Sequence, residues 1–90
     1  MKILEVTYAG YYMIDIEFED GTKGCVDLSD LVQSGVFTAL KDRNAFAKVY
    51  TTGYSVAWSE QLEIDAAALY AEVTGKEPAT FYAHKSYASN

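Results

Sequence analysis

The sequence has one cysteine, one histidine and one proline among 90 residues, so it is poor in the side chains that form disulfides or bind zinc. A single cysteine, Cys25, excludes a disulfide within the chain and is typical of proteins in a reducing cytoplasm. A structural zinc site of the usual kind needs four nitrogen or sulfur ligands, and only Cys25 and His84 could contribute. We therefore expect a cytoplasmic protein without a metal or another cofactor.

Long apolar runs are also missing. The longest extend over only a few residues, whereas a membrane helix needs about 20. Glu5 interrupts the region where a signal peptide would carry its apolar stretch. We expect neither a secretion signal nor a membrane partner.

Positive charge is scarce. The sequence contains seven lysines and arginines but 13 acidic residues, so the net charge is −6 at pH 7. Surfaces that bind nucleic acid or anionic membranes gather Lys and Arg in clusters. In this sequence only Lys41 and Arg43 lie close together. Binding to nucleic acid is therefore disfavoured.

Half of the residues are hydrophobic and eight are tyrosines, so a folded core is expected. Residues 3–8 and 12–18 alternate between two faces, which predicts strands with one buried side. A hairpin turn at residues 9–11 would join them. This pattern turns Ile3 and Met13 outward. The inward side chains would be Leu4, Val6, Tyr8, Tyr12, Ile14, Ile16 and Phe18.

The stretch FEDGTKGCVDLSDL, residues 18–31, predicts a second hairpin. A two-residue turn at Asp20-Gly21 would turn Val26 outward, whereas a three-residue loop at 19–21 turns it toward the core. The longer loop also places Lys23 opposite Glu17 as a pair of opposite charges. We therefore predict the three-residue loop, with Gly21 in the left-handed region at a bulge.

Within this register Cys25 lies opposite Asp15 and points outward. Gly24 faces Ile16, and its missing side chain would let a helix pack closely against the strand.

Helical signals follow the third strand. Asp27 or Ser29 can cap a first short helix over residues 28–32 that ends at Ser34-Gly35, and residues 36–40 form an apolar connection. Asp42 can cap a second short helix with Phe46, Val49 and Tyr50 on one face.

Residues 48–51 and 54–59 predict another hairpin, with a two-residue loop at Thr52-Gly53 that aligns Val49 with Val56. Asp65 can cap the last helix, which ends at Gly75. The expected fold is a small α+β domain over residues 1–78, with an antiparallel sheet of two hairpins and about five strands packed with two or three short helices. Residues 79–90 form an aromatic C-terminal tail, either flexible or docked on a partner.

Several motifs resemble a bacterial family catalogued as domain of unknown function 2442. They are FEDGTKGCVDLSDL, GVFTALKDRNAFAKV, VAWSE and IDAAALYAEVTG, and the likeness extends to about Pro78. The resemblance implies a small α+β fold and a family without an established biochemical role or known catalytic residues. Some relatives carry a helix-turn-helix or are encoded beside another small protein, as in toxin–antitoxin pairs. Ser59-Glu60-Gln61 replaces the Asn-Gly element found in many members.

Three groups of residues could in principle support chemistry. Asp15 and Glu17 lie on one strand face and could perform acid–base chemistry or hold a divalent ion, but they are about 6–7 Å apart and Lys23 partly neutralises them. Cys25 is surrounded by carboxylates, which oppose a reactive thiolate. A surface role for His84 is favoured over a Ser–His pair. We therefore expect no enzymatic activity.

The outward apolar residues indicate an interface, since exposed apolar patches often mark binding surfaces. The candidate partner contacts are Ile3, Met13, Asp15, Glu17, Cys25, Phe81 and Tyr82. The favoured function is a protein-interaction or regulatory module that binds another small protein, in the manner of one half of a toxin–antitoxin-like pair. The alternatives are a homo-oligomeric structural protein, such as a homodimer, and a small enzyme that uses the acidic strand face.

Overall fold

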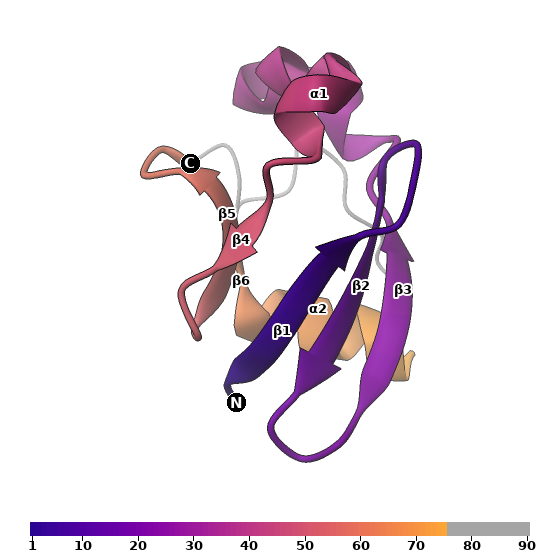
Figure 1. The fold of residues 1–90 in the computed structure, drawn as a ribbon, viewed down its shortest axis with the longest axis vertical. Helices are drawn as coiled ribbons and strands as arrows, with labels where there is room; N and C mark the ends of the chain where they lie inside the picture. Colours follow the sequence, from indigo (N-terminus) through magenta and orange to yellow (C-terminus); the bar gives the residue numbers. More distant parts are fainter. Residues whose placement is uncertain (76–90) are drawn as a thin grey trace.

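The computed structural model describes residues 1–75, which form two three-stranded antiparallel sheets joined by short helices (Figure 1). The first sheet contains β1 (Ile3–Tyr8), β2 (Met13–Phe18) and β3 (Lys23–Asp27) in the order β1-β2-β3. The second contains β4 (Tyr50–Thr51), β5 (Ser55–Ser59) and β6 (Leu62–Asp65) in the order β4-β5-β6. The expected α+β class is confirmed. The aromatic tail predicted at residues 79–90 lies outside the described residues.

The β2–β3 hairpin has the predicted register. Ile14 pairs with Val26, Asp15 with Cys25, and Glu17 with Lys23. The loop is closed at Phe18, whose N–H donates to the carbonyl of Thr22 at 2.8 Å, and Gly21 has a φ of 90°. Burial of Val26 thus selected the three-residue loop, and the left-handed Gly21 makes that loop possible.

The start of β1 differs from the prediction. Ile3 pairs with Phe18 and Glu5 with Glu17, so Leu4 is an extra residue in a β-bulge. The bulge reverses the expected sides, because Ile3 is 3% exposed and Leu4 is 59% exposed. The N–H of Ile3 donates to the carbonyl of Gly53 at 2.7 Å. The bulge therefore turns Ile3 into the core beside the second sheet, and the outward orientation predicted for Ile3 is wrong.

The β4–β5 hairpin also differs in register. Thr51 pairs with Val56, where the sequence predicted Val49 opposite Val56. The loop is Gly53-Tyr54, with Gly53 at a φ of 97°, and a glycine at the first central position is typical of a tight hairpin turn. A shift of two residues leaves every side chain on its predicted side, so Val56 is still buried.

The strand β6 was not anticipated. It pairs antiparallel with β5, with Val56 opposite Ile64. Ile64 is fully buried and Glu63 is exposed, so the segment does alternate. It is only four residues long and follows a turn without glycine, which leaves a weak pattern in the sequence.

The connection between the sheets consists of the 3-10 helices η1 (Leu31–Gln33) and η2 (Gly35–Lys41) and the helix α1 (Arg43–Phe46). They lie together at one end of both sheets (Figure 1). The second 3-10 helix includes residues 36–40, which the sequence predicted only as an apolar connection. The predicted cap of α1 is confirmed, because the Asp42 Oδ1 accepts from the N–H of Asn44 at 3.0 Å.

The helix α2 (Ala66–Thr74) packs across the core side of the first sheet (Figure 1). It ends where predicted, at Gly75, whose φ is 73° and whose N–H donates to the carbonyls of Ala71 and Glu72. The carboxylate of Asp65 makes no capping hydrogen bond to the helix, contrary to expectation. Instead the N–H of Ala66 donates to the carbonyl of Tyr54 at 2.9 Å.

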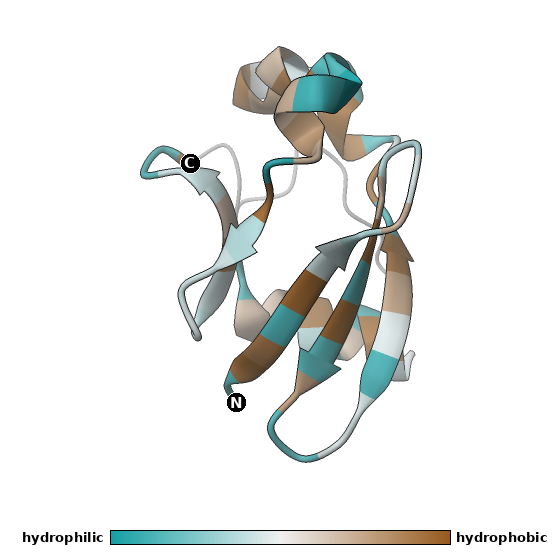
Figure 2. Ribbon diagram, viewed as in Figure 1, coloured by the Kyte–Doolittle hydropathy of each residue, from teal (hydrophilic) through white to brown (hydrophobic). Residues whose placement is uncertain are grey.

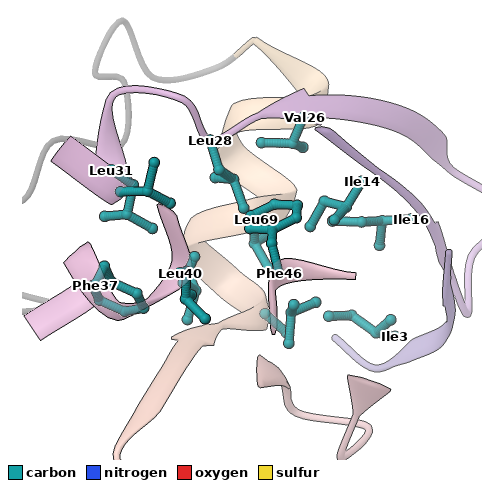
Figure 3. Close-up of a cluster of buried hydrophobic side chains, with 14 of the residues drawn as sticks. Ile3, Ile14, Ile16, Val26, Leu28, Leu31, Phe37, Leu40, Phe46 and Leu69 are labelled. Carbon is teal, nitrogen blue, oxygen red and sulfur yellow. The ribbon is translucent and has the colours of Figure 1, made fainter. Parts of the chain in front are cut away.

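A single apolar core joins the two sheets and the helices. Figure 2 shows the alternation of apolar and polar residues along β1 and β2, and Figure 3 shows the inward side chains around Leu69 of α2. Beside them, the ring N–H of Trp58 donates to the carbonyl of Phe46 at 2.8 Å. The core therefore occupies one side of the first sheet, and the opposite side is left for other contacts.

Candidate functional site

The outer face of the first sheet carries rows of polar side chains that run across the strands. The pairing of β1 with β2 and of β2 with β3 fixes which residues share a row. The rows are Glu5–Glu17–Lys23, Thr7–Asp15–Cys25 and Met13–Asp27. Because side chains alternate along a strand, the register that turns the even-numbered residues of β2 and β3 toward the core turns these odd-numbered ones to the outer face.

A hollow of about 400 Å³ lies on this face. Charged and polar side chains of all three strands supply most of its lining. The lining residues are Glu5, Thr7, Asp15, Ile16, Glu17, Lys23, Gly24 and Cys25. A space of this size on a sheet face can hold one or two side chains of a bound chain.

The charge of this face is strongly negative. Glu5 lies directly opposite Glu17, and like charges at opposing positions destabilise a sheet. Among the described residues, Lys23, on the other side of Glu17, is the only basic residue that lines the hollow. The face is therefore matched to a ligand that brings positive charge.

The thiol of Cys25 is held in its protonated form. Partial burial raises the pKa of Cys25 above its ordinary value, and the carboxylates of Asp15 and Asp27 raise it further. A thiol needs nearby positive charge to become a thiolate at neutral pH. The surroundings of Cys25 do the opposite, so this arrangement opposes nucleophilic chemistry.

The structure brings together only part of the predicted contact set. Asp15, Glu17 and Cys25 line the hollow, whereas Met13, half-buried at the start of β2, does not. Ile3 belongs to the core. The predicted contacts Phe81 and Tyr82, like His84, lie outside the described residues.

Glu5 and Thr7 were missing from that set. Their alternation with the inward residues of β1 was the signal that places them on this face.

Within residues 1–75, no three side chains of His, Cys, Asp or Glu are grouped so that they could hold a metal ion. In the same part of the chain, no helix has the length and apolar character needed to cross a membrane.

Comparison with known proteins yields one result. Residues 3–75 match a protein family described as "Protein of unknown function (DUF2442)". Neither the curated proteins nor the solved structures contain a match to the chain. The matched range ends at Gly75, one residue after α2, so it covers both sheets and the hollow.

Proposed function

We propose that this chain, which belongs to the DUF2442 family of proteins of unknown function, is a cytoplasmic, non-enzymatic protein-interaction module that binds a basic segment of another small protein. The observation that carries the proposal is the acidic hollow on the outer face of β1–β3. Within residues 1–75, the helix α2 lies on the opposite side of this sheet and no helix or strand covers the outer face (Figure 1). Complementary charge across an interface steers association and selects partners.

The chemistry of the partner follows from the lining. Glu5, Asp15 and Glu17 offer carboxylates from two neighbouring strands, spaced so that separate basic side chains can contact separate acids. Arginine forms paired hydrogen bonds with a carboxylate, which gives it an advantage over lysine at such a face. We therefore expect an extended or helical partner segment that presents several Arg or Lys side chains.

A non-enzymatic role is supported by the environment of the same groups. A carboxyl that works as a general acid or base is normally desolvated or paired so that its pKa moves toward neutrality. Asp15 is exposed on its strand, and Cys25 has a raised pKa. An enzyme that uses the acidic strand face is the less favoured alternative.

The experiment is a selection of peptides from a random display library on the immobilised full chain, followed by affinity measurements on the selected peptides. We expect enrichment of Arg and Lys, and binding that weakens as salt is added. The triple variant Glu5→Gln, Asp15→Asn, Glu17→Gln should bind the selected peptides about tenfold more weakly. It removes the negative charge of the three carboxylates and leaves the shape of the hollow nearly unchanged.

The matched control is the triple variant Asp30→Asn, Glu60→Gln, Asp65→Asn, which removes the same charge from exposed positions outside the hollow. It should retain the affinity of the unmodified chain. Selected peptides without basic residues, or equal loss of affinity in both triple variants, would contradict the proposal.

A partner encoded beside this chain, as in a toxin–antitoxin-like pair, would be one carrier of such a basic segment. Co-purification of the two products, lost in the Glu5, Asp15, Glu17 variant and kept in the control, would identify it.

A further inference from the structure

The strand β3 has an unpaired edge. It is the last strand in the order β1-β2-β3, and no other strand lies beyond it within residues 1–75. The carbonyl of Thr22 accepts from the N–H of Phe18, and the N–H of Leu28 donates to the carbonyl of Tyr12, so the even-numbered residues of this segment direct their backbone groups toward β2. By the alternation of an antiparallel ladder, Lys23 and Cys25 direct their N–H and C=O groups away from the sheet.

This edge lacks three of the features that can prevent pairing. Edge strands are commonly protected by proline, by a bulge or by a covering helix. The strand β3 contains no proline, and its register with β2 is unbroken. The helix α2 covers its core side, where Val73 packs on Gly24, and leaves the edge itself open.

The side chains along the edge are complementary to themselves. Lys23, Cys25 and Asp27 share the outer face of β3, with opposite charges at equal distances on either side of the cysteine. When two such strands run antiparallel about a twofold axis at Cys25, each Lys23 lies opposite Asp27 of the other copy. Opposite charges at directly opposed positions stabilise a strand pair.

We propose that two copies of this chain associate through β3, antiparallel and centred on Cys25, so that their first sheets form one continuous sheet. In this register Lys23 lies between Glu17 of its own chain and Asp27 of the second copy. Sliding the strands by two residues places Lys23 opposite Cys25 or Ser29, which removes both charge pairs. The charges thus select one register among those that the backbone allows.

This inference goes beyond the proposed function, because it assigns the edge of β3 and not the hollow. The two ideas can fail separately, since the edge pairing depends on Lys23 and Asp27, and peptide binding on Glu5, Asp15 and Glu17. An interface built on one five-residue strand is smaller than a stable dimer needs, so the association is weak and depends on concentration.

The test measures the oligomeric state of the full chain by sedimentation equilibrium up to about 1 mM, a range that covers weak association. We expect reversible dimers. Lys23→Glu and Asp27→Lys should each raise the dissociation constant about tenfold, because every charge pair across the dyad becomes a repulsion.

An equimolar mixture of the two variants should recover dimerisation, because each acid of one copy then faces a lysine of the other. This recovery also shows that both variants are folded. Lys48→Glu, which makes the same charge change at an exposed position far from β3 in the chain, should dimerise like the unmodified chain.

A short bis-maleimide provides an independent readout of the register. It should link Cys25 to Cys25 in the unmodified chain and in the mixture, and should do so much less in either variant alone. A chain that stays monomeric throughout the concentration range would overturn the inference. That result is expected if the edge of β3 binds a different protein. Variants that dimerise unchanged, or a mixture that stays monomeric, would also overturn it.

Discussion

Gly24 is a point of close approach between β3 and α2. A Cβ atom built on Gly24 would lie 2.6 Å from Cγ1 of Val73, far inside the contact distance of two carbon atoms. The backbone of Gly24 is not in the left-handed region, so the glycine is required for space alone. This close approach fixes the distance of the helix from the sheet.

We therefore predict that Gly24→Ala lowers the free energy of unfolding by about 1–3 kcal/mol, the usual cost of an overpacked core. Urea unfolding would measure it. In a Val73→Ala background, Gly24→Ala should lower the free energy of unfolding by a smaller amount, because the shorter side chain at position 73 removes the clash. Equal effects of Gly24→Ala in both backgrounds would contradict this explanation.

Asp20 links the β2–β3 loop to α2. Its Oδ2 accepts from the hydroxyl of Tyr70 at 2.6 Å, and its Oδ1 accepts from the N–H of Thr22 at 2.9 Å. The Tyr70 hydroxyl, followed by Thr22, holds the pKa of Asp20 below its ordinary value. Since the pKa is lower in the folded chain, the ionised carboxylate stabilises the fold above the pKa of the unfolded state. This contribution is lost as the pH falls through the folded pKa.

Tyr70→Phe should consequently raise the pKa of Asp20, as followed by NMR titration of its carboxyl carbon. Tyr54→Phe, at an exposed tyrosine, should leave that pKa unchanged. An Asp20 pKa that does not respond to Tyr70→Phe would show that the hydrogen bond is not formed in solution.

At the scale of the element, the bulge in β1 decides which of two neighbouring apolar residues is buried. Without it, Leu4 would face the core and Ile3 the solvent. The extra residue places Ile3 against the core cluster and leaves Leu4 exposed. An alternation rule applied to residues 3–8 has no means of detecting such an insertion.

The bulge predicts that truncating Ile3 and truncating Leu4 affect the stability of the fold very differently. Ile3→Ala should lower the free energy of unfolding by about 2–5 kcal/mol, the range for truncating a buried aliphatic side chain. Leu4→Ala should change it by no more than about 0.5 kcal/mol, as for an exposed site. Chemical denaturation of both variants measures the difference, and a larger effect at Leu4 would contradict the bulge.

At the scale of the whole molecule, one apolar cluster includes residues of both sheets, the 3-10 helices and α2. Trp58 lies where these parts meet, with its ring 5.4 Å from that of Phe46 and 6.2 Å from that of Phe37. Neither sheet can lose its contacts without exposing part of the shared cluster. The two sheets should therefore unfold together.

We predict one cooperative unfolding transition. The fluorescence of Trp58, which reports on the second sheet and the connecting helices, should follow the same urea curve as the far-UV circular dichroism of the whole chain. Separate midpoints for the two signals would show that the sheets unfold independently.

Elements with a strong local signal were predictable. The β2–β3 hairpin has alternating side chains and a turn glycine, and only one loop length turns Val26 toward the core. Its register was predicted correctly. The end of α2 at Gly75 and the cap of α1 at Asp42 were likewise marked by single residues. The Asp65 cap, the register of β4–β5 and the strand β6 were not predicted correctly, because short elements are positioned by contacts with other parts of the chain.

The candidate site shows the same division. The order of acidic and apolar residues along β2 and β3 is enough to place Asp15, Glu17 and Cys25 on one outer face, because a strand alternates and the apolar side must be buried. The sequence does not reveal that Ile3 leaves this face or that Glu5 stands opposite Glu17 in a hollow. Those features depend on the bulge and on pairing between strands. Strand pairing is decided by how segments that are distant in the sequence pack around the shared core.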